Sequence, residues 1–401
     1  MSHPDRNYQT SPGLYLAFIV TALVTLPGVW LGFSGTHVSP IVGSILFGAA
    51  ILGAAFILSW AAEAAQIDIS QSLAIAIMAL VAVLPEYAVD FVFTWKAAHD
   101  PEQAHYAIAN MTGANRLLVG LGWPVILFIY IWATKKKELI LNEHQRVEIF
   151  YLATATLYSF TIPLKGSLNL FDTVILVTLY GLYVRRVAKM EAEEPDLVGP
   201  VKIVANMKDI PRRVCTAIMF LFAGLAIFAV AEPFAVSLVE TGGVLGIDKF
   251  LLVQWLAPLA SEAPEVIIVA TWSLRGQAGA AMKAIMSSKV NQWTLLIGTI
   301  PLVYAFSGQA VKPFVLDNFQ NAELYLTAAQ SLFGVALLIC LKFDRTSGIL
   351  LLLLFLSQLI VHEIRIQVTW IYIIFAAIYI FKARGSILPT IKTGLFPDRP
   401  G

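Results

Sequence analysis

Long apolar runs, separated by short polar segments, follow one another along the whole chain. A helix that crosses a bilayer needs about 20 mostly apolar residues. The pattern predicts an all-helical polytopic membrane protein with about twelve transmembrane helices. The predicted spans are residues 14–33, 38–62, 70–95, 106–132, 148–164, 168–187, 214–238, 250–274, 281–306, 324–341, 347–362 and 367–382.

The longest polar segment, residues 188–213, divides the chain into a first transmembrane half, 14–187, and a second, 214–382. It holds three prolines and charges of both signs, so we expect a loop or a surface helix. We expect no second, soluble domain. The polar N-terminal residues lack a short apolar region followed by a small-residue cleavage site, so no cleaved signal peptide is expected.

The composition agrees with lipid as the solvent. Hydrophobic residues make up 58% of the chain and charged residues only 13%, against about 25% charged residues in soluble domains. There are too few polar residues to cover a soluble protein, which excludes a soluble enzyme and a nucleic-acid-binding protein. The net charge of +1 gives no reason to expect a polyanionic partner, and the lipid bilayer is the surrounding that the composition requires. Nothing in it indicates an oligomeric state.

Basic residues are unevenly distributed among the loops. When the loops are assigned alternately to the two sides of the membrane, most of the 27 Lys and Arg fall on one side. Cytoplasmic loops carry such an excess. We therefore expect a cell-membrane protein with residues 188–213 and both ends of the chain on the cytoplasmic side.

Two segments, about 68–132 and 248–306, are similar to each other. Each has Pro-Glu in the middle of one predicted span, at Glu86 and Glu265, followed by an apolar stretch and Thr-Trp. The next span in each has an asparagine before a glycine and a proline. Because five spans separate Glu86 from Glu265, the two copies are expected to cross the membrane in opposite directions, as in secondary transporters.

This repeat defines the expected architecture. Spans two to six and seven to eleven form two inverted five-helix repeats, with broken helices at the midplane, and the first and last spans are additions. A chance similarity between two helices with Pro-Glu is the alternative.

Six ionisable residues lie well inside the four repeated spans, away from their ends. A charge at the bilayer centre costs at least about 2.5–3.5 kcal/mol, so these groups should face inward and contact ions, water or each other. Helical spacing places Asp90 on the face of Glu86, and Glu262 on the face of Glu265. The six residues are Glu86, Asp90, Arg116, Glu262, Glu265 and Lys289.

Prolines next to the central glutamates add further oxygen ligands. Pro85 and Pro264 should kink their helices and release backbone carbonyls, and Pro258 adds a second break. Carboxylates and carbonyls suit hard cations such as Ca²⁺ or Na⁺. Nearby hydroxyl and amide oxygens come from Thr112, Ser261, Ser287, Ser288, Asn110, Asn115 and Asn291.

Several of these groups have a second interpretation. The central glutamates could be structural acids neutralised by Arg116 and Lys289, and Asp90 and Glu262 could pair with these cations without touching the ion. Arg116 and Lys289 are themselves expected to be charge-compensating, since neither can ligate a cation when charged.

Two further sets of residues, the asparagines and three acids near span ends, have interpretations other than ion binding. The asparagines could join helices by hydrogen bonds instead of binding ions. Glu148, Asp172 and Glu323 lie near the ends of predicted spans and are expected to be solvated.

At these motifs the chain resembles the sodium/calcium exchanger family, within the Ca²⁺/cation antiporter superfamily. The first copy reads AVLPE at 82–86 and ANMTGAN at 109–115, and the second reads SEAPE at 261–265 and IMSSKVN at 285–291. The resemblance implies that Glu86 and Glu265 are the central ion-binding glutamates, and that Asn110 and Asn115 match the asparagines of the first motif.

The chain also departs from the family pattern. Ala82 and Val83 stand where the family has hydroxyl residues, and Met286 stands at the position of the first asparagine in copy two. Arg116 follows the first motif, and Lys289 replaces a glycine of the second. Because fixed positive charges can stand where cations would otherwise bind, fewer ions would bind or protons would replace some of them.

The residues and the resemblance together predict a secondary cation antiporter that works by alternating access. Glu86 and Glu265 would bind competing cations (Na⁺, Ca²⁺ or H⁺) as the metal-binding carboxylates. The chain has no ATP motif and is expected to need no cofactor. The alternatives are Na⁺/H⁺ or other cation/proton exchange on the same scaffold, a cation channel, and a membrane enzyme, for which no nucleophile–base pair is found.

Overall fold

The computed structural model describes residues 8–68, 83–190, 197 and 199–396. The chain forms two compact units, Met1–Val92 with Met190–Pro264, and Phe93–Lys189 with Glu265–Gly401. Each unit therefore takes residues from both halves of the sequence. The divisions fall inside two helices, α4 (Leu84–Ala97) and α12 (Lys249–Leu274).

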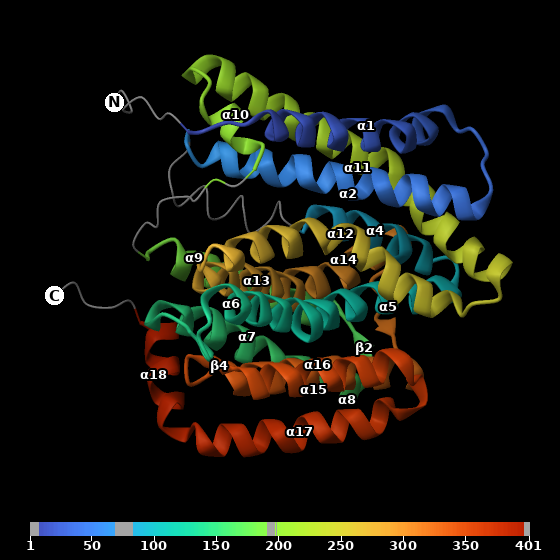
Figure 1. Ribbon diagram of the computed structural model, residues 1–401. Helices are drawn as coiled ribbons and strands as arrows, with labels where there is room; N and C mark the ends of the chain where they lie inside the picture. Colours follow the sequence, from blue (N-terminus) through green and yellow to red (C-terminus); the bar gives the residue numbers. More distant parts are fainter. Residues whose placement is uncertain (1–7, 69–82, 191–196, 198, 397–401) are drawn as a thin grey trace. The chain divides into compact units, whose positions relative to one another are not determined.

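The first unit contains three long helices that lie side by side, α1 (Pro12–Ser34), α2 (Pro40–Ala65) and α11 (Asp209–Leu245) (Figure 1). Two glycines of α1 allow close packing. A Cβ atom on Gly28 would lie 2.4 Å from the carbonyl oxygen of Leu46, and one on Gly32 would lie 2.5 Å from that of Ala229. Small residues at such spacing let helix backbones approach each other in membranes.

The polar segment 188–213 is partly helical where it is described. It contains the short helix α10 (Val201–Ala205) and the first turn of α11. Leu197, Val201 and Val204 are buried in an apolar cluster with Trp60 and other residues of α2. The described part of the segment thus packs into the core of the first unit, and its assignment as a cytoplasmic loop stays a prediction.

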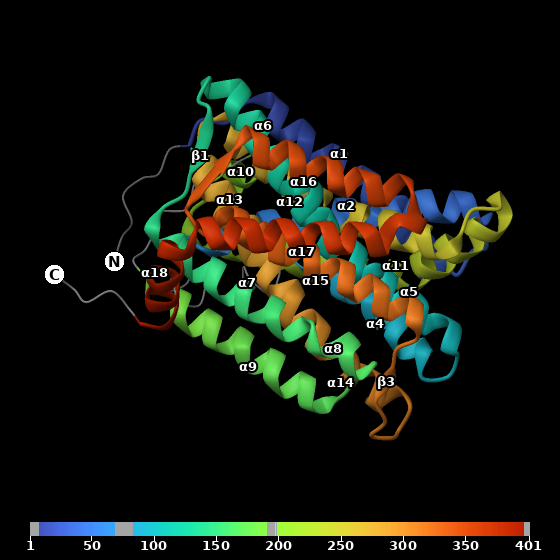
Figure 2. The ribbon, with the colours of Figure 1, turned by 90° about the horizontal axis from the view of Figure 1, so that it is seen from below.

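The second unit contains most of the remaining elements, and Figure 2 shows its helices α7, α9, α15 and α17. In chain order the elements are α5 (Pro101–Leu117), η1 (Leu118–Gly122), α6 (Trp123–Thr134), β1 (Glu138–Ile140), η2 (Glu143–Gln145), α7 (Arg146–Ser159), α8 (Thr161–Lys165), β2 (Ser167–Leu168), α9 (Leu170–Val187), α13 (Ala278–Asn291), η3 (Gln292–Leu296), α14 (Ile297–Ser307), β3 (Phe314–Val315), α15 (Asn318–Leu338), β4 (Lys342–Asp344), α16 (Arg345–Ile360), η4 (His362–Ile364), α17 (Arg365–Lys382) and α18 (Arg384–Leu395).

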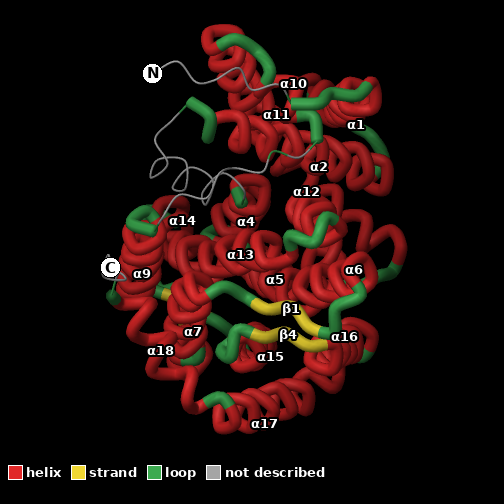
Figure 3. Tube along the Cα trace, turned by 60° about the vertical axis from the view of Figure 1, so that its left-hand side comes forward, coloured by secondary structure: helices red, strands yellow, loops and turns green. Residues whose placement is uncertain are grey.

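One order of elements occurs twice in this unit. Helix α6 is followed by β1, α7 with α8, β2 and α9, and α14 is followed by β3, α15, β4 and α16. The strands pair antiparallel across the two series, β1 with β4 (Figure 3) and β2 with β3. Figures 1 and 2 show the two short ribbons at opposite ends of the helices. Each series thus gives one strand to each end of the unit.

The helix interruptions lie in the spans that follow the two Pro-Glu helices. Helix α12 continues through Pro258 and Pro264 without ending, because a proline removes only one backbone hydrogen bond and the adjacent turns can persist. Pro85 is the second residue of α4, where a missing N–H is tolerated. The earlier part of that predicted span, residues 70–82, lies outside the described residues. The interruptions are two π-helical turns, η1 and η3, one in each copy of the following span.

Seven helical segments among the described residues are long and apolar enough to cross a membrane. They are Pro12–Ser34, Pro40–Ala65, Pro101–Thr134, Glu143–Lys165, Asp209–Leu245, Lys249–Leu274 and Arg365–Lys382. The other predicted spans are helical where they are described, so the number of twelve stays a prediction. Helix α18 lies beyond the last predicted span and was not expected.

Candidate cation-binding site

Two buried carboxylates lie one turn apart on α4. Glu86 is in the first turn of the helix, and Asp90 follows at i+4. The N-terminal end of a helix favours a negative charge, since its backbone N–H groups carry a partial positive charge. The local structure therefore presents Glu86 and Asp90 together on one face, as the spacing predicted.

Helix α12 carries the other carboxylates. Glu262 is buried and Glu265 is partly buried. The hydroxyl of Ser261 donates to the backbone oxygens of Ala257 (3.3 Å) and Pro258 (3.2 Å). Its hydrogen is satisfied within the helix, and its oxygen still has acceptor capacity.

Ser288 on α13 hydrogen-bonds to the carboxylate of Glu265. The adjacent Ser287 has another partner, since its Oγ accepts a hydrogen bond from the Tyr183 hydroxyl at 2.8 Å. Ser288 therefore contacts Glu265, the central glutamate of the second copy, whereas Ser287 bonds to Tyr183.

Lys289, fully buried on α13, reaches the corresponding helix of the first copy. Its Nζ donates to the side-chain oxygen of Asn115 (2.6 Å) and to the Asn115 backbone oxygen (3.1 Å). It also lies 4.4 Å from the centre of the Trp293 ring, a favourable cation–π position. The Asn115 amide nitrogen donates to the Met111 backbone oxygen at 2.8 Å. The amide oxygen considered as an ion ligand is thus hydrogen-bonded to an ammonium group.

The other two asparagines are also buried. The amide nitrogen of Asn291 donates to the Tyr180 hydroxyl on α9 at 3.2 Å. This is a helix–helix hydrogen bond of the kind considered as the alternative to ion binding. Asn110 lies on α5, inside the second unit.

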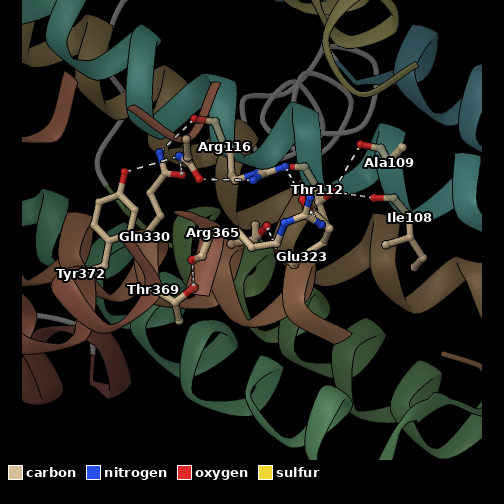
Figure 4. Close-up of polar contacts among 11 residues, drawn as sticks. Ile108, Ala109, Thr112, Arg116, Glu323, Gln330, Arg365, Thr369 and Tyr372 are labelled. Atoms are coloured by element: carbon tan, nitrogen blue, oxygen red, sulfur yellow. Dashed lines mark hydrogen bonds and ion pairs between the residues drawn. The ribbon is translucent and has the colours of Figure 1, made fainter. Parts of the chain in front are cut away.

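Arg116 forms an ion pair with an acid outside the two repeated segments. Its guanidinium donates to Glu323 Oε2 at 2.6 Å and to Gln358 Oε1 at 3.2 Å (Figure 4). The other carboxylate oxygen of Glu323 accepts from Arg365 at 3.0 Å, and the Arg365 guanidinium lies 4.1 Å from the Phe319 ring centre. Glu323 therefore bridges two arginines from different helices.

Amide side chains extend this cluster into a closed loop. Gln358 Nε2 donates to Gln330 Oε1 at 3.1 Å, and Gln330 Nε2 donates back to the Arg116 backbone oxygen at 3.1 Å. Gln358 Nε2 also lies 3.5 Å from the Tyr372 hydroxyl. The cluster ties α5, which carries two candidate asparagines, to α15, α16 and α17. The cluster was not predicted, although polar residues at helical spacing, Glu323, Thr327 and Gln330, are a signal that could have indicated a buried polar face.

The expectation that three acids are solvated was wrong. Glu148, Asp172 and Glu323 are all buried. Asp172 accepts a hydrogen bond from the Tyr158 hydroxyl at 2.6 Å and pairs with Lys165. A position near a helix end does not reveal whether neighbouring helices cover it, and here they do.

Comparison with known families identifies the fold and the broad activity. The family model described as sodium/calcium exchanger protein matches residues 39–188 and 216–362. The chain belongs to the sodium/calcium exchanger family. It is an integral membrane cation exchanger, and its candidate site lies in the segments that resemble the family motifs.

Solved structures similar to the exchanger agree with this assignment. The crystal structure of the H⁺/Ca²⁺ exchanger CAX is 43% identical over 96% of this chain and 98% of that one, with a TM-score of 0.92. YfkE (14% identity, 85% and 98% coverage, TM-score 0.60) and the sodium-calcium exchanger NCX_Mj (18%, 82% and 98%, 0.54) share the fold. No curated protein matches the exchanger.

Proposed function

We propose that the exchanger moves Ca²⁺ across the membrane in exchange for H⁺. The observation that carries this proposal is the 43% identity to the H⁺/Ca²⁺ exchanger CAX over 96% of the chain. The likeness to NCX_Mj, at 18% identity, concerns the fold alone. Of the two exchange modes considered from the sequence, cation/proton exchange is therefore the better supported.

The contact of Lys289 with Asn115 supports protons over Na⁺ as the counter-ion. The family resemblance makes Asn115 a candidate ion ligand, and its side-chain oxygen instead accepts from Lys289 at 2.6 Å. A resident ammonium repels a second cation and occupies an oxygen that a Na⁺ ion would need. With fewer monovalent sites, protons on carboxylates become the simplest counter-charge.

In this proposal Glu86 and Glu265 carry the competing cations. Ca²⁺ requires six to eight oxygen ligands. Among the residues that the structure describes, no three His, Cys, Asp or Glu side chains form a group that could hold a metal. The remaining ligands would then be hydroxyl, amide and backbone oxygens, with Ser261, Ser288 and Asn110 as candidates.

The coupling of Ca²⁺ movement to H⁺ movement follows from the free-energy cost of an unneutralised carboxylate. A carboxylate without a cation or a proton is expensive to keep in a water-poor site, so each glutamate would reorient only when loaded. Asp90 and Glu262 are assigned a secondary role, as further ligands or as partners of fixed cations. Arg116 would compensate Glu323, and Lys289 would take the place of a bound cation.

We further propose that the two repeats are inverted and that both ends of the chain face the cytoplasm. The strand pairing supports inversion, since the first strand of each series pairs with the second strand of the other. The excess of basic residues on one side supports the orientation. Reporter fusions at the C-terminus, active only on one side of the membrane, test it.

Transport in reconstituted vesicles tests the exchange mode. Radioactive Ca²⁺ uptake is measured with a pH gradient alone and with a Na⁺ gradient alone. We expect uptake with the pH gradient, abolished by a protonophore, and little effect of Na⁺. Glu86→Gln and Glu265→Gln should reduce uptake to the level of protein-free vesicles. Glu240→Gln, which changes an exposed acid on α11, is the control and should leave uptake unchanged.

Two results would contradict the proposal separately. Uptake that follows the Na⁺ gradient and ignores the protonophore would reject H⁺ as the counter-ion and leave the glutamates in place. Normal transport by either glutamine variant would reject the site assignment.

A further inference from the structure

Helix α18 lies across the ends of the helices in the second unit. It follows α17 after a sharp turn and runs crosswise to it (Figures 1 and 2). Because α17 is long and apolar enough to cross the membrane, a helix crosswise to it at its end runs along the membrane surface.

The inner face of α18 is fixed by specific contacts. Arg146 on α7 donates to the Thr390 hydroxyl at 3.0 Å. Arg186 on α9 donates to the backbone oxygens of Thr393 (2.9 Å) and Phe396 (3.1 Å). A Cβ on Gly394 would lie 2.3 Å from the Phe150 ring, so α18 packs directly on α7. The helix therefore cannot turn its outer face inward.

The outer face is apolar and flanked by cations. Leu388, Ile391 and Leu395 are 59%, 39% and 53% exposed, and their spacing of three and four residues forms one stripe along the helix. Arg384 and Lys392 are also exposed. The segment 384–395 contains no acidic residue. An apolar stripe with basic neighbours is typical of a helix that lies in the headgroup region of a bilayer.

Aromatic residues close to cations support the position of α18 at the level of the lipid headgroups. Arg384 lies 5.0 Å from the Phe381 ring, and Lys382 lies 5.8 Å from the Tyr379 ring, at the end of α17. At the end of α6, Lys135 lies 5.7 Å from the Trp132 ring. Aromatic rings with Lys and Arg nearby are enriched at the membrane–water interface.

We propose that α18 is an interfacial helix that binds anionic phospholipid headgroups. Arg384 and Lys392 contact the headgroups, and Leu388, Ile391 and Leu395 enter the acyl boundary. The positive charge of the outer face of α18 indicates an anionic lipid surface as its binding partner. Two cations without an acid attract an anionic lipid surface, and a second copy of this chain would bring the same positive charges to the contact. The inference is independent of which ions are exchanged.

Lipid binding to the full chain in detergent tests the cationic part. Short-chain phosphatidylglycerol is titrated, with short-chain phosphatidylcholine and inorganic phosphate as comparison ligands. We expect preference for phosphatidylglycerol. A basic residue near an anionic surface contributes about 1 kcal/mol, or about fivefold in affinity. Arg384→Gln with Lys392→Gln should therefore weaken binding by about 25-fold.

A charge-matched variant serves as the control. Lys137→Gln with Lys312→Gln removes two exposed cations from loops outside α18 and should leave phosphatidylglycerol binding unchanged. Equal weakening in both double variants would show that net charge, and not α18, is responsible, and would overturn the proposal. Equal affinity for phosphatidylglycerol and inorganic phosphate would overturn it as well.

A depth measurement tests the apolar part without relying on affinity. After Cys215→Ser and Cys340→Ser, an environment-sensitive fluorophore is attached at Leu388→Cys in vesicles with and without phosphatidylglycerol. We expect quenching by lipids brominated on their chains. Quenching only by water-soluble agents would overturn the proposal. A signal that depends on protein density and not on lipid quenchers would assign the face to a second copy of the chain.

Discussion

Two carboxylates in this exchanger are each held between two arginines, in very different surroundings. Glu323, with 4% of its side chain exposed, pairs with Arg116 (2%) and Arg365 (19%) among the helices of the second unit. Asp68, at 10%, follows the last turn of α2 in the first unit and pairs with Arg212 (8%) and Arg213 (62%). The charges are the same, but the set around Asp68 includes one arginine, Arg213, that is far more exposed than any member of the set around Glu323.

This difference decides what each cluster contributes. In a buried cluster, removal of one partner leaves charges that neither water nor a counter-ion stabilises. Where a partner is exposed, as Arg213 is beside Asp68, water replaces the lost partner and salt screens the remaining charges. The cluster around Glu323 should therefore be sensitive to every member, and the cluster around Asp68 should show a graded response.

The largest effect is expected from Glu323→Gln. The substitution leaves the buried Arg116 and the half-buried Arg365 without their carboxylate, which should cost about 3–5 kcal/mol of stability. Thermal unfolding in detergent, followed by fluorescence, measures the loss. Glu143→Gln removes an acid that is 73% exposed and pairs with Arg146, and should cost no more than about 1 kcal/mol. Equal losses in the two variants would refute the comparison.

A middle effect is expected from Asp68→Asn, and it should depend on pH. Hydrogen bonds from Arg212, and secondarily from Arg213, hold the pKa of Asp68 below its ordinary value, against an opposing effect of burial. Hydrogen bonds to charged groups contribute about 1.5–3 kcal/mol. Because the folded-state pKa is lowered, this stabilisation is fully present above the unfolded-state pKa of about 4 and is lost as the pH falls through the folded-state value.

The measurement for Asp68 is the difference in stability between the natural chain and Asp68→Asn along a pH series. The difference should stay constant from neutral pH to about pH 5 and shrink in more acidic solution. A difference that grows on acidification would have the wrong sign and would exclude the carboxylate of Asp68 as its source.

The smallest effect is expected from Arg213→Gln. Its side chain is 62% exposed, so the lost pair should cost about 0.2–1 kcal/mol, and less in high salt. Unfolding of this variant and of Asp68→Asn, each at low and high ionic strength, checks the order. If Arg213→Gln matched Asp68→Asn in cost and did not respond to salt, exposure would not be the controlling variable.

The seven long apolar helical segments of the described residues could be predicted from the sequence because about 20 mostly apolar residues in a row indicate a membrane span. The spans that follow the two Pro-Glu helices were predicted to be broken, but the form of the break, the π-helical turns η1 and η3, was not, since a single wide turn leaves no trace in hydropathy. Pro258 and Pro264 suggested breaks, yet α12 continues through both. Helix α18 was missed because Gly385, Pro389 and Gly394 disfavour a helix, and contacts with α7 and α9 outweigh that preference.

The candidate site was predictable to the extent that it depends on local spacing. The pairing of Glu86 with Asp90 on one face follows from helical geometry alone. The partner of Arg116 did not follow, because Glu323 is 207 positions away in the chain and only tertiary packing brings them together. The link between Lys289 and Asn115 was missed for the same reason. The sequence indicated that Arg116 and Lys289 are buried charges, but only the packing of the helices shows which residues they contact.

The crossed pairing of β1 with β4 and of β2 with β3 has a consequence for how the polypeptide is assembled. Neither series of helices can complete a ribbon by itself, since each ribbon needs one strand from early and one from late in synthesis. The N-terminal series must wait, with two unpaired edges, until its counterpart has been made. The two ribbons can therefore form only after the strands of the second series have been made, and a chain cut between the two series would form them only if its pieces associated.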